Sequence, residues 1–342
     1  VKIHINEAVL DATGMIDQHK IDLVARMGAN WYSRSNVGMF EVEKPLTTLG
    51  IGVDMIPDFI KESGYFDLQH PTSIQFLPTG LLPFSEITSL DSMHLMAMQG
   101  KGGNSLVLLN TDSTSFSLVS PLTSDITLSS FVQVDSLLYL FDEKMDVFVS
   151  TFPYDSSSTR KLSNTRPNWT STSACFHKTT HRIYFNPEVE NPTANRLRSV
   201  YTFNVNKNRF TSAPLFSFDV DEIERFAAEN GIRIHANRIT ELNDTVHGLT
   251  IIPNAIAVHP KTNEVYILSG ADRSLIVFDQ FGVVKNYSEL DASLFPNPTG
   301  LTFAQNGDLL ISNEDLIKNS IVRISWNKLW QSKGGKGLVF GR

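Results

Sequence analysis

Residues 254–268 read NAIAVHPKTNEVYIL, and residues 299–312 read TGLTFAQNGDLLIS. Each stretch contains two short apolar runs with a polar turn between them, and a third apolar run follows, at 274–279 and at 320–324. The second stretch lies 44–45 residues after the first. A repeat of that length, built from short antiparallel strands, is typical of the blades of a β-propeller. The two units therefore predict an all-β chain with a propeller fold.

Three weaker copies of the same unit precede these two. They begin near Glu86, Ser129 and Thr172, about 43 residues apart, so five blades are predicted. About 35 extra residues separate the third copy from the fourth, and a sixth, degraded blade within 232–252 is the alternative. Residues 73–77 alternate with period two. We expect them to form the outer strand of the last blade, because a closed ring leaves no exposed sheet edge.

The extra residues, near 219–250, contain the signals of a helical insertion. Asp219 or Asp221 can cap the start of a helix, and Ile223 and Phe226 fall on one apolar stripe. Gly231 follows at a position suited to end the helix. A loop region carried on a rigid propeller is also a natural place for variable function.

The first 62 residues differ in sequence pattern from the rest of the chain, and they predict a small mixed α/β segment. Asp17 is a plausible N-cap, and Ile21, Val24 and Met27 recur at helical spacing before Gly28, which predicts a helix over 17–27. We expect strands at 2–9 and 39–42 and a further helical turn at 57–62.

Composition excludes several classes of protein. The chain has 342 residues with a formal net charge of −7, and no Lys/Arg run is longer than two, which argues against a nucleic-acid partner. No stretch approaches 18 consecutive apolar residues, so we predict no membrane span. The single cysteine, Cys175, rules out an intrachain disulfide and a cysteine-based zinc site. We expect a monomer.

Six stretches carry a likeness to a known family: FDL at 66–68, FLP at 76–78, SEITSL at 85–90, NAIAVHPKTNEVYILS at 254–269, LIVFDQFG at 275–282 and LFPNPTGLTF at 294–303. Together they resemble the SdiA-regulated family of bacterial propeller proteins. The resemblance implies a propeller domain over 66–342. Because that family is mostly exported, it also implies a periplasmic or cell-envelope location, with the cytoplasm as the alternative. The activity of the family is poorly defined, so the resemblance bears on fold more than on function.

The resemblance also points to a candidate site. The family tends to carry a Glu-Gly pair at the start of each innermost strand, which implies a ring of carboxylates suited to calcium. The matching residues here are Glu86, Ser129, Thr172, Asn254 and Thr299, and only Glu86 is a carboxylate, which weakens the expectation of bound calcium. We therefore expect a ring of small polar groups at one end of the central channel. This ring would bind an unidentified small molecule or protein, or hold water.

The N-terminal segment, residues 1–62, resembles a different family. KIDLVARMG at 20–28, WYSR at 31–34, FEVEKP at 40–45 and LGIGVDMIP at 49–57 are similar to the C-terminal tail of flavin reductase-like proteins of the flavoredoxin type. The resemblance covers only a tail, and the barrel that binds FMN in that family would lie before Val1. An FMN site is therefore not expected in this chain.

Three functions follow from these observations. We expect a binding or scaffolding propeller without catalytic activity, and we assign no catalytic residue, metal or cofactor. The first alternative is a metal-dependent propeller hydrolase of the phosphoesterase or lactonase type. That chemistry needs several carboxylates or amides at the channel mouth. Only Glu86 and Asn254 meet this need. The second alternative is part of a flavin reductase-like fusion protein.

Two further groups of residues are candidate sites. Glu241, Asp244 and His247 lie close together in the insertion and could form an acid/base pair, but a polar surface loop is the simpler interpretation. His177 and His259 occupy equivalent positions in two blades. We expect them to cap the turns after the innermost strands rather than to face a common ligand.

Overall fold

The computed structural model divides into two compact units, residues 1–62 and 63–342, and each is described by itself. The residues that it describes are 2–4, 24–27, 30–33, 64–77, 83–91, 93–99, 105–111, 115–119, 127–151, 156–192, 194–239, 245–314 and 319–328.

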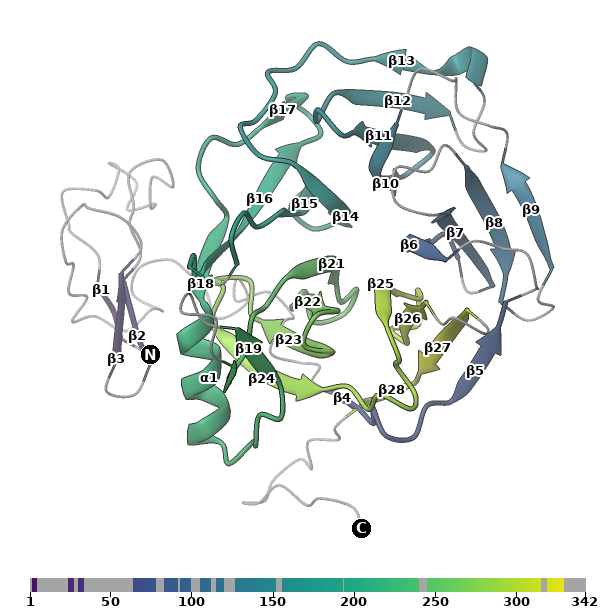
Figure 1. Cartoon of the computed structure of the whole chain (residues 1–342). Coiled ribbons are helices and arrows are strands. Elements are labelled where there is room, and N and C mark those ends of the chain that lie inside the picture. The colour runs from purple at the N-terminus through teal and green to yellow at the C-terminus, as the bar shows by residue number, and fades with distance from the viewer. Residues whose placement is uncertain are drawn as a thin grey trace, which may run out of the picture. The chain divides into compact units, whose positions relative to one another are not determined.

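The second unit is a propeller of five antiparallel blades arranged in a ring, which confirms the predicted fold class (Figure 1). Blade 1 contains β6 (Phe84–Ser89), β7 (His94–Gln99), β8 (Leu106–Asn110) and β9 (Phe116–Val119). Blade 2 contains β10 (Leu128–Val134), β11 (Leu137–Asp142), β12 (Val147–Thr151) and β13 (Arg160–Lys161), with the short helix η5 (Ser156–Ser158) before β13. Blade 3 contains β14 (Ser171–His177), β15 (Arg182–Pro187), β16 (Leu197–Asn204), β17 (Arg209–Phe210) and β18 (Phe216–Asp219).

The two blades with the clearest sequence repeat follow. Blade 4 contains β21 (Pro253–Val258), β22 (Val265–Ser269), β23 (Ser274–Phe278) and β24 (Val284–Glu289). Blade 5 contains β25 (Pro298–Phe303), β26 (Leu309–Asn313), β27 (Ser320–Ile324) and β5 (Ser73–Phe76). The pairing of β5 with β27 closes the ring with a strand from the start of the propeller, as predicted. Beside this closure β4 (Gly64–Phe66) pairs with β28 (Trp326–Lys328).

The hydrophobic core lies between blades rather than inside any one of them. Blades 4 and 5 share a cluster that includes Tyr266, Leu268, Phe303 and Ile311, and each other pair of neighbouring blades shares a cluster of the same kind. Middle strands are therefore covered on both faces, and every residue of β22 and β23 is buried. This double burial explains why these strands read as continuous apolar runs instead of alternating ones.

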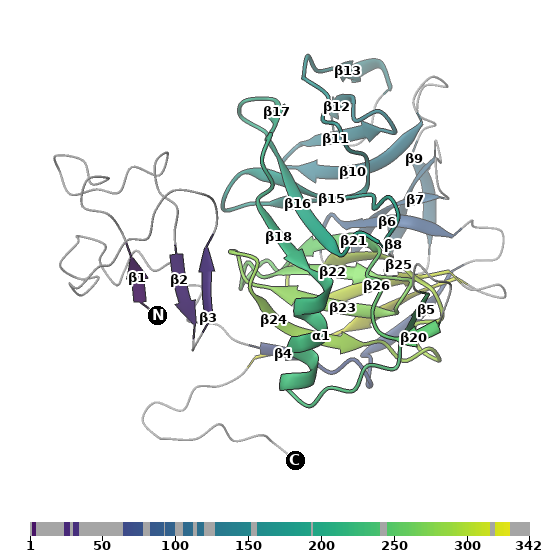
Figure 2. The ribbon, with the colours of Figure 1, turned by 60° about the vertical axis from the view of Figure 1, so that its left-hand side comes forward.

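The insertion contains one helix and one small hairpin. The N-cap of helix α1 (Val220–Glu229) is Asp219, whose carboxylate accepts a hydrogen bond from the Asp221 backbone N–H, so Asp219 and not Asp221 caps the helix. Its buried side chains Val220, Ile223 and Ala227 join the core of blades 3 and 4, and the helix lies against β24 (Figure 2). After it, β19 (Asn237–Ile239) pairs with β20 (Thr245–His247) as a two-stranded sheet, not as a sixth blade.

The described part of the N-terminal unit is a three-stranded antiparallel sheet. It consists of β1 (Lys2–His4), β2 (Val24–Met27) and β3 (Asn30–Ser33). The helix predicted over 17–27 is therefore wrong at its C-terminal end, because Val24–Met27 pairs on both sides as a strand. Met27 pairs with Asn30, only three positions further on, so a tight local strand pairing outweighs the helical spacing of the apolar residues. The predictions at 39–42 and 57–62 lie outside the described residues.

Across these described ranges, no helix is long and apolar enough to cross a membrane.

Candidate functional site

The five residues predicted to form a polar ring lie at or next to an irregularity that every blade repeats. Each innermost strand has a register shift near its start, at Phe84/Glu86, Leu128/Ser130, Ser171/Ala174, Pro253/Ala255 and Pro298/Gly300. Ser129, Asn254 and Thr299 are the extra residues of these bulges, and Thr172 lies within the third. In the first blade the extra residue is Ser85, so Glu86 lies one position further along its strand.

Glu86 is buried in the centre of the ring and joins three blades. Its carboxylate accepts one hydrogen bond from the backbone N–H of Phe131 in blade 2, at 2.8 Å, and one from that of Ala174 in blade 3, at 2.6 Å. The side chain is only 2% exposed. Burial raises the pKa of Glu86 well above its ordinary value, and hydrogen bonds from Ala174, Phe131 and Ser173 offset part of that rise in pKa.

Asn254 and Thr299 continue the same pattern around the ring. The Asn254 amide donates to the carbonyl of Pro298 in blade 5, at 2.9 Å, and accepts from the backbone of Gly270. The Thr299 hydroxyl donates to the carbonyl of Phe84 in blade 1, at 2.6 Å. Both side chains therefore connect their own blade to the next one.

Blades 3 and 4 are connected by a residue that the sequence argument missed. The Ser173 hydroxyl accepts a hydrogen bond from the backbone N–H of Ile256 in β21, at 3.1 Å. Ser173 is the neighbour of Thr172, whose side chain lies outside the described part. Ser129 bonds within its own blade, to the carbonyls of Phe141 and Asp142. The bulge inserts one extra residue, and the sequence alone does not say which of two adjacent polar residues faces the next blade.

These contacts form a continuous circle through all five innermost strands. An innermost strand pairs with only one neighbour in its own sheet, so its other edge carries backbone groups that need partners. Side chains supply several of those partners here. At Gly300 a β-carbon would lie 2.6 Å from the Ser312 hydroxyl of the same blade and 3.2 Å from the Ile87 backbone nitrogen of blade 1, so glycine suits this crowded position. The geometry gives Glu86, Asn254 and Thr299 internal partners, and their predicted role in ligand binding stays a prediction.

A groove opens on blade 3, at the end of the ring where the innermost strands begin. Its volume is about 490 Å³. We call it the blade 3 groove, and it is lined by Lys144, Pro167, Asn168, Trp169, Thr170, Pro187, Glu188, Val189, Glu190, Asn195, Leu197, Arg198, Ser199 and Tyr201. Pairing of Ser171 with Pro187 places the start of β14 beside the end of β15, at this end of the blade.

The groove exists because blade 3 is incompletely paired. Strand β15 pairs with β16 only along residues 201–204 of β16. Residues 197–200 of β16 pair instead with β18. Glu188, Val189, Glu190 and Asn195 lie outside these pairings and line one wall of the groove. The Trp169 and Tyr201 rings form the aromatic part of the lining, with ring centroids 5.0 Å apart and planes inclined by 34°.

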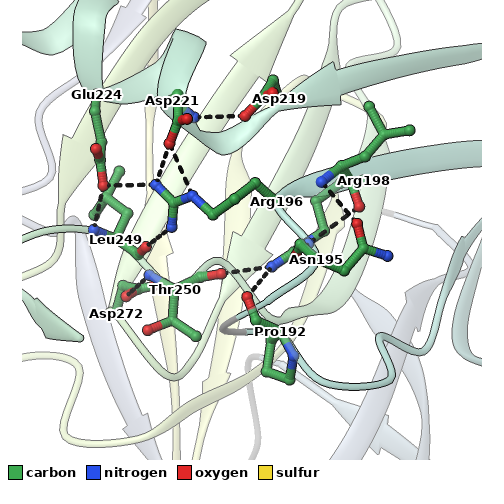
Figure 3. A network of polar contacts seen from close by, with 11 residues as sticks. Pro192, Asn195, Arg196, Arg198, Asp219, Asp221, Glu224, Leu249, Thr250 and Asp272 are labelled. Atoms are coloured by element: carbon green, nitrogen blue, oxygen red, sulfur yellow. Dashed lines mark hydrogen bonds and ion pairs between the residues drawn. The ribbon is translucent and has the colours of Figure 1, made fainter. Parts of the chain in front are cut away.

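A network centred on two arginines holds this wall in place (Figure 3). All five N–H donors of Arg198 bond to carbonyl oxygens, those of Pro192, Asn195, Leu197, Thr250 and Ile251. Burial, with Arg196 nearby, lowers the pKa of Arg198 to about 10. Arg196 donates to the carboxylates of Asp221 and Glu224 and to the carbonyl of Leu249.

The network also fixes the segment 249–252, which leads into blade 4. Asp272 accepts hydrogen bonds from the backbone N–H groups of Thr250 and Ile251, at 2.9 and 2.7 Å. Ile251 has φ of +44°, a left-handed conformation that a β-branched residue rarely adopts. Strained backbone persists where the surroundings over-determine it, so this segment is a rigid support for the groove wall.

The histidine candidates cap turns, as expected. His177 Nδ1 lies 2.7 Å from the Thr180 hydroxyl, and its Nε2 lies 2.8 Å from the Asn263 side chain of blade 4. His259 Nδ1 accepts from the backbone of Lys261 and Thr262. His247 is exposed, and Glu241 and Asp244 lie outside the described residues. In the part of the chain that the structure describes, no group of three or more His, Cys, Asp or Glu is placed to hold a metal ion.

Comparison with known proteins finds only distant similarity to solved structures. No family model matches the chain, and no curated protein matches its sequence. Among solved structures, glutaminyl cyclase from Myxococcus xanthus is 10% identical with a TM-score of 0.47, over 76% of this chain and 96% of that chain. A calcium-binding protein, regucalcin, from Agrobacterium tumefaciens is 11% identical with a TM-score of 0.45, over 74% and 94%. The WD40 β-propeller domain of Doa1 is 13% identical with a TM-score of 0.41, over 74% and 97%.

With TM-scores below 0.5, these similarities carry no argument about this chain. The resemblances of 66–342 to the SdiA-regulated family and of 1–62 to flavin reductase-like proteins remain predictions.

Proposed function

We propose that this protein is a non-enzymatic binding propeller, and that its ligand or partner occupies the blade 3 groove. The groove lies at the end of the ring where the innermost strands begin, the end at which we expected a site. We place the ligand in this groove and not among Glu86, Asn254 and Thr299, because those side chains already bond to neighbouring blades.

One observation carries the proposal: the groove combines an aromatic surface with polar groups on a fixed frame. Its volume, about 490 Å³, falls in the range typical of small-molecule sites. A second concavity, of about 420 Å³, is lined by Ser73, Gln75, Thr111, Leu310, Ile321 and Arg323 and has no aromatic side chain. Fixed walls favour binding, because less conformational entropy is lost when the ligand arrives.

A fragment screen by NMR tests the proposal. Fragments should perturb residues of the blade 3 groove, and their binding should be lost in Trp169→Ala. Phe281→Ala is the matched control, because Phe281 is an aromatic residue 58% exposed in the turn between β23 and β24, at the opposite end of the ring. Hits that persist in Trp169→Ala and weaken in Phe281→Ala would contradict the proposal.

The alternative hydrolase is tested in the same preparation. A metal-dependent enzyme should shift its thermal midpoint by several degrees with calcium or magnesium, or with EDTA, because a ligand that binds only the native state stabilises it. For a binding propeller of the proposed kind we expect no such shift. The resemblance to the SdiA-regulated family further supports a cell-envelope location, which fractionation of the source cells would test.

A further inference from the structure

We propose that the blade 3 groove binds a neutral saccharide, an inference that rests on the function proposed above. A saccharide presents apolar C–H faces together with hydroxyl groups that both donate and accept hydrogen bonds. The groove offers matching features: aromatic rings, hydrogen-bond donors and acceptors without an internal partner, and no net charge in its lining.

The aromatic surface comes from two half-buried residues. The Trp169 ring packs against Phe185, Tyr201 and Phe210, with ring centroids 5.7, 5.0 and 5.5 Å away, which fixes its orientation. Trp169 and Tyr201 both line the groove, and their neighbouring rings supply its aromatic part. Rings of this kind have an apolar body and a polar tip, and they bind ligands with one apolar face and one polar edge.

Polar groups without an internal partner line the same groove. Within the described part of the chain, no hydrogen bond or ion pair is made by the side chains of Asn168, Trp169, Glu190 and Tyr201, or by the Lys144 ammonium. They supply an amide, an indole N–H donor, a carboxylate acceptor, a hydroxyl and a cationic donor. Donors and acceptors are thus both available, as a ring of hydroxyl groups requires.

The charges of the lining balance. Lys144 and Arg198 are opposed by Glu188 and Glu190, so the lining has no excess of one sign. Arg198 is 2% exposed and keeps its positive charge in this balance, but all its guanidinium donors bond to backbone carbonyls, so it has none left for an anionic ligand. A phosphorylated, sulfated or carboxylated ligand, or an organic cation, would favour a lining with an excess of the opposite charge. A neutral ligand fits the balance that is present.

An array of neutral, sialylated and sulfated glycans tests this inference on the full chain. We expect neutral glycans to be retained, and the best of them to be measured by calorimetry. Asn168→Ala and Tyr201→Phe each remove one free polar group and should weaken binding roughly 3–10-fold. Trp169→Ala should weaken it more than about tenfold. Phe281→Ala should stay within about twofold of the unchanged protein.

The outcomes separate the two proposals. If fragments occupy the groove but no neutral glycan binds, or only acidic glycans bind, the saccharide inference is wrong and the binding function stands. If neither fragments nor glycans bind in the groove, both are wrong. Trp169 also packs against Phe185 and Phe210, so Trp169→Ala could unfold; Asn168→Ala and Tyr201→Phe leave that packing intact. Unchanged affinity in both of these variants overturns the inference.

Discussion

Replacing Glu86 by alanine removes the side chain that joins blades 1, 2 and 3 at the centre of the ring. The carboxylate accepts the backbone N–H groups of Phe131 and Ala174, and the buried alanine variant leaves both without a partner. Each buried polar group left unpaired costs about 1–3 kcal/mol, so with two such groups Glu86→Ala should lower the free energy of unfolding by about 2–6 kcal/mol. The free energy of unfolding of Glu86→Gln should lie between those of Glu86→Ala and the unchanged protein. Its amide oxygen can accept only one of the two N–H groups, while its amide nitrogen faces the other.

The effect should depend on pH in a direction set by the raised pKa of Glu86. A group whose pKa is higher in the folded state stabilises the fold fully below its unfolded pKa, and that contribution is lost as the pH rises toward the folded pKa. The loss amounts to at most about 1.4 kcal/mol for each pH unit above roughly 4.3. The difference in stability between the unchanged protein and Glu86→Ala should therefore shrink as the pH rises.

Urea unfolding followed by tryptophan fluorescence, at about pH 5.5 and about pH 8.5, measures both quantities. Glu143→Ala is the matched control, because Glu143 is an exposed carboxylate in the turn between β11 and β12. Taking differences between variants removes the contribution of other titrating groups. If Glu86→Ala is as stable as Glu143→Ala, or if its deficit grows with pH, the account of a buried carboxylate bridging three blades is refuted.

Three further predictions concern single contacts. Arg166 and Lys161 lower the pKa of Asp146 to about 2. The stability that Asp146 contributes should therefore be lost as the pH falls from about 4 to about 2. At neutral pH, Asp146→Asn should lower the free energy of unfolding by about 1–2 kcal/mol, measured by urea unfolding. Asp219→Ala removes the N-cap of α1 and should cost about 1 kcal/mol by the same measurement. Arg198→Met leaves buried carbonyls without donors and should cost about 2–4 kcal/mol, with faster proteolysis within 249–252.

Each of these three predictions has its own control. Asp146→Asn should lose its effect below about pH 2, where the native carboxylate is protonated as well. Asp219→Asn should keep most of the cap, since asparagine also accepts from the helix N-terminus. Arg196→Met should cost less than Arg198→Met, because the Asp221 partner of Arg196 is 60% exposed. Equal costs for the two arginine variants would count against the role given to buried carbonyls.

Local patterns predicted much of the propeller. The repeats at 254–268 and 299–312 gave the strands of blades 4 and 5, and the alternation of 73–77 gave the closing strand β5. Asp219 was correctly among the candidates for the cap of α1. These features depend on turn residues, apolar periods and caps, which act over a few neighbouring positions and can be read in the chain itself.

The sequence by itself therefore determined the class of fold, the number of blades, the closure of the ring and the position of the inserted helix. Only the tertiary structure decided that Glu86 reaches Phe131 and Ala174, that Ser173 bonds to blade 4, and that the blade 3 groove forms. The physical reason is distance along the chain. Glu86 lies 45 and 88 residues from its two partners, and the groove collects side chains from three separate segments. Such contacts are set by the radius of the ring and the register of its strands, which no local period encodes.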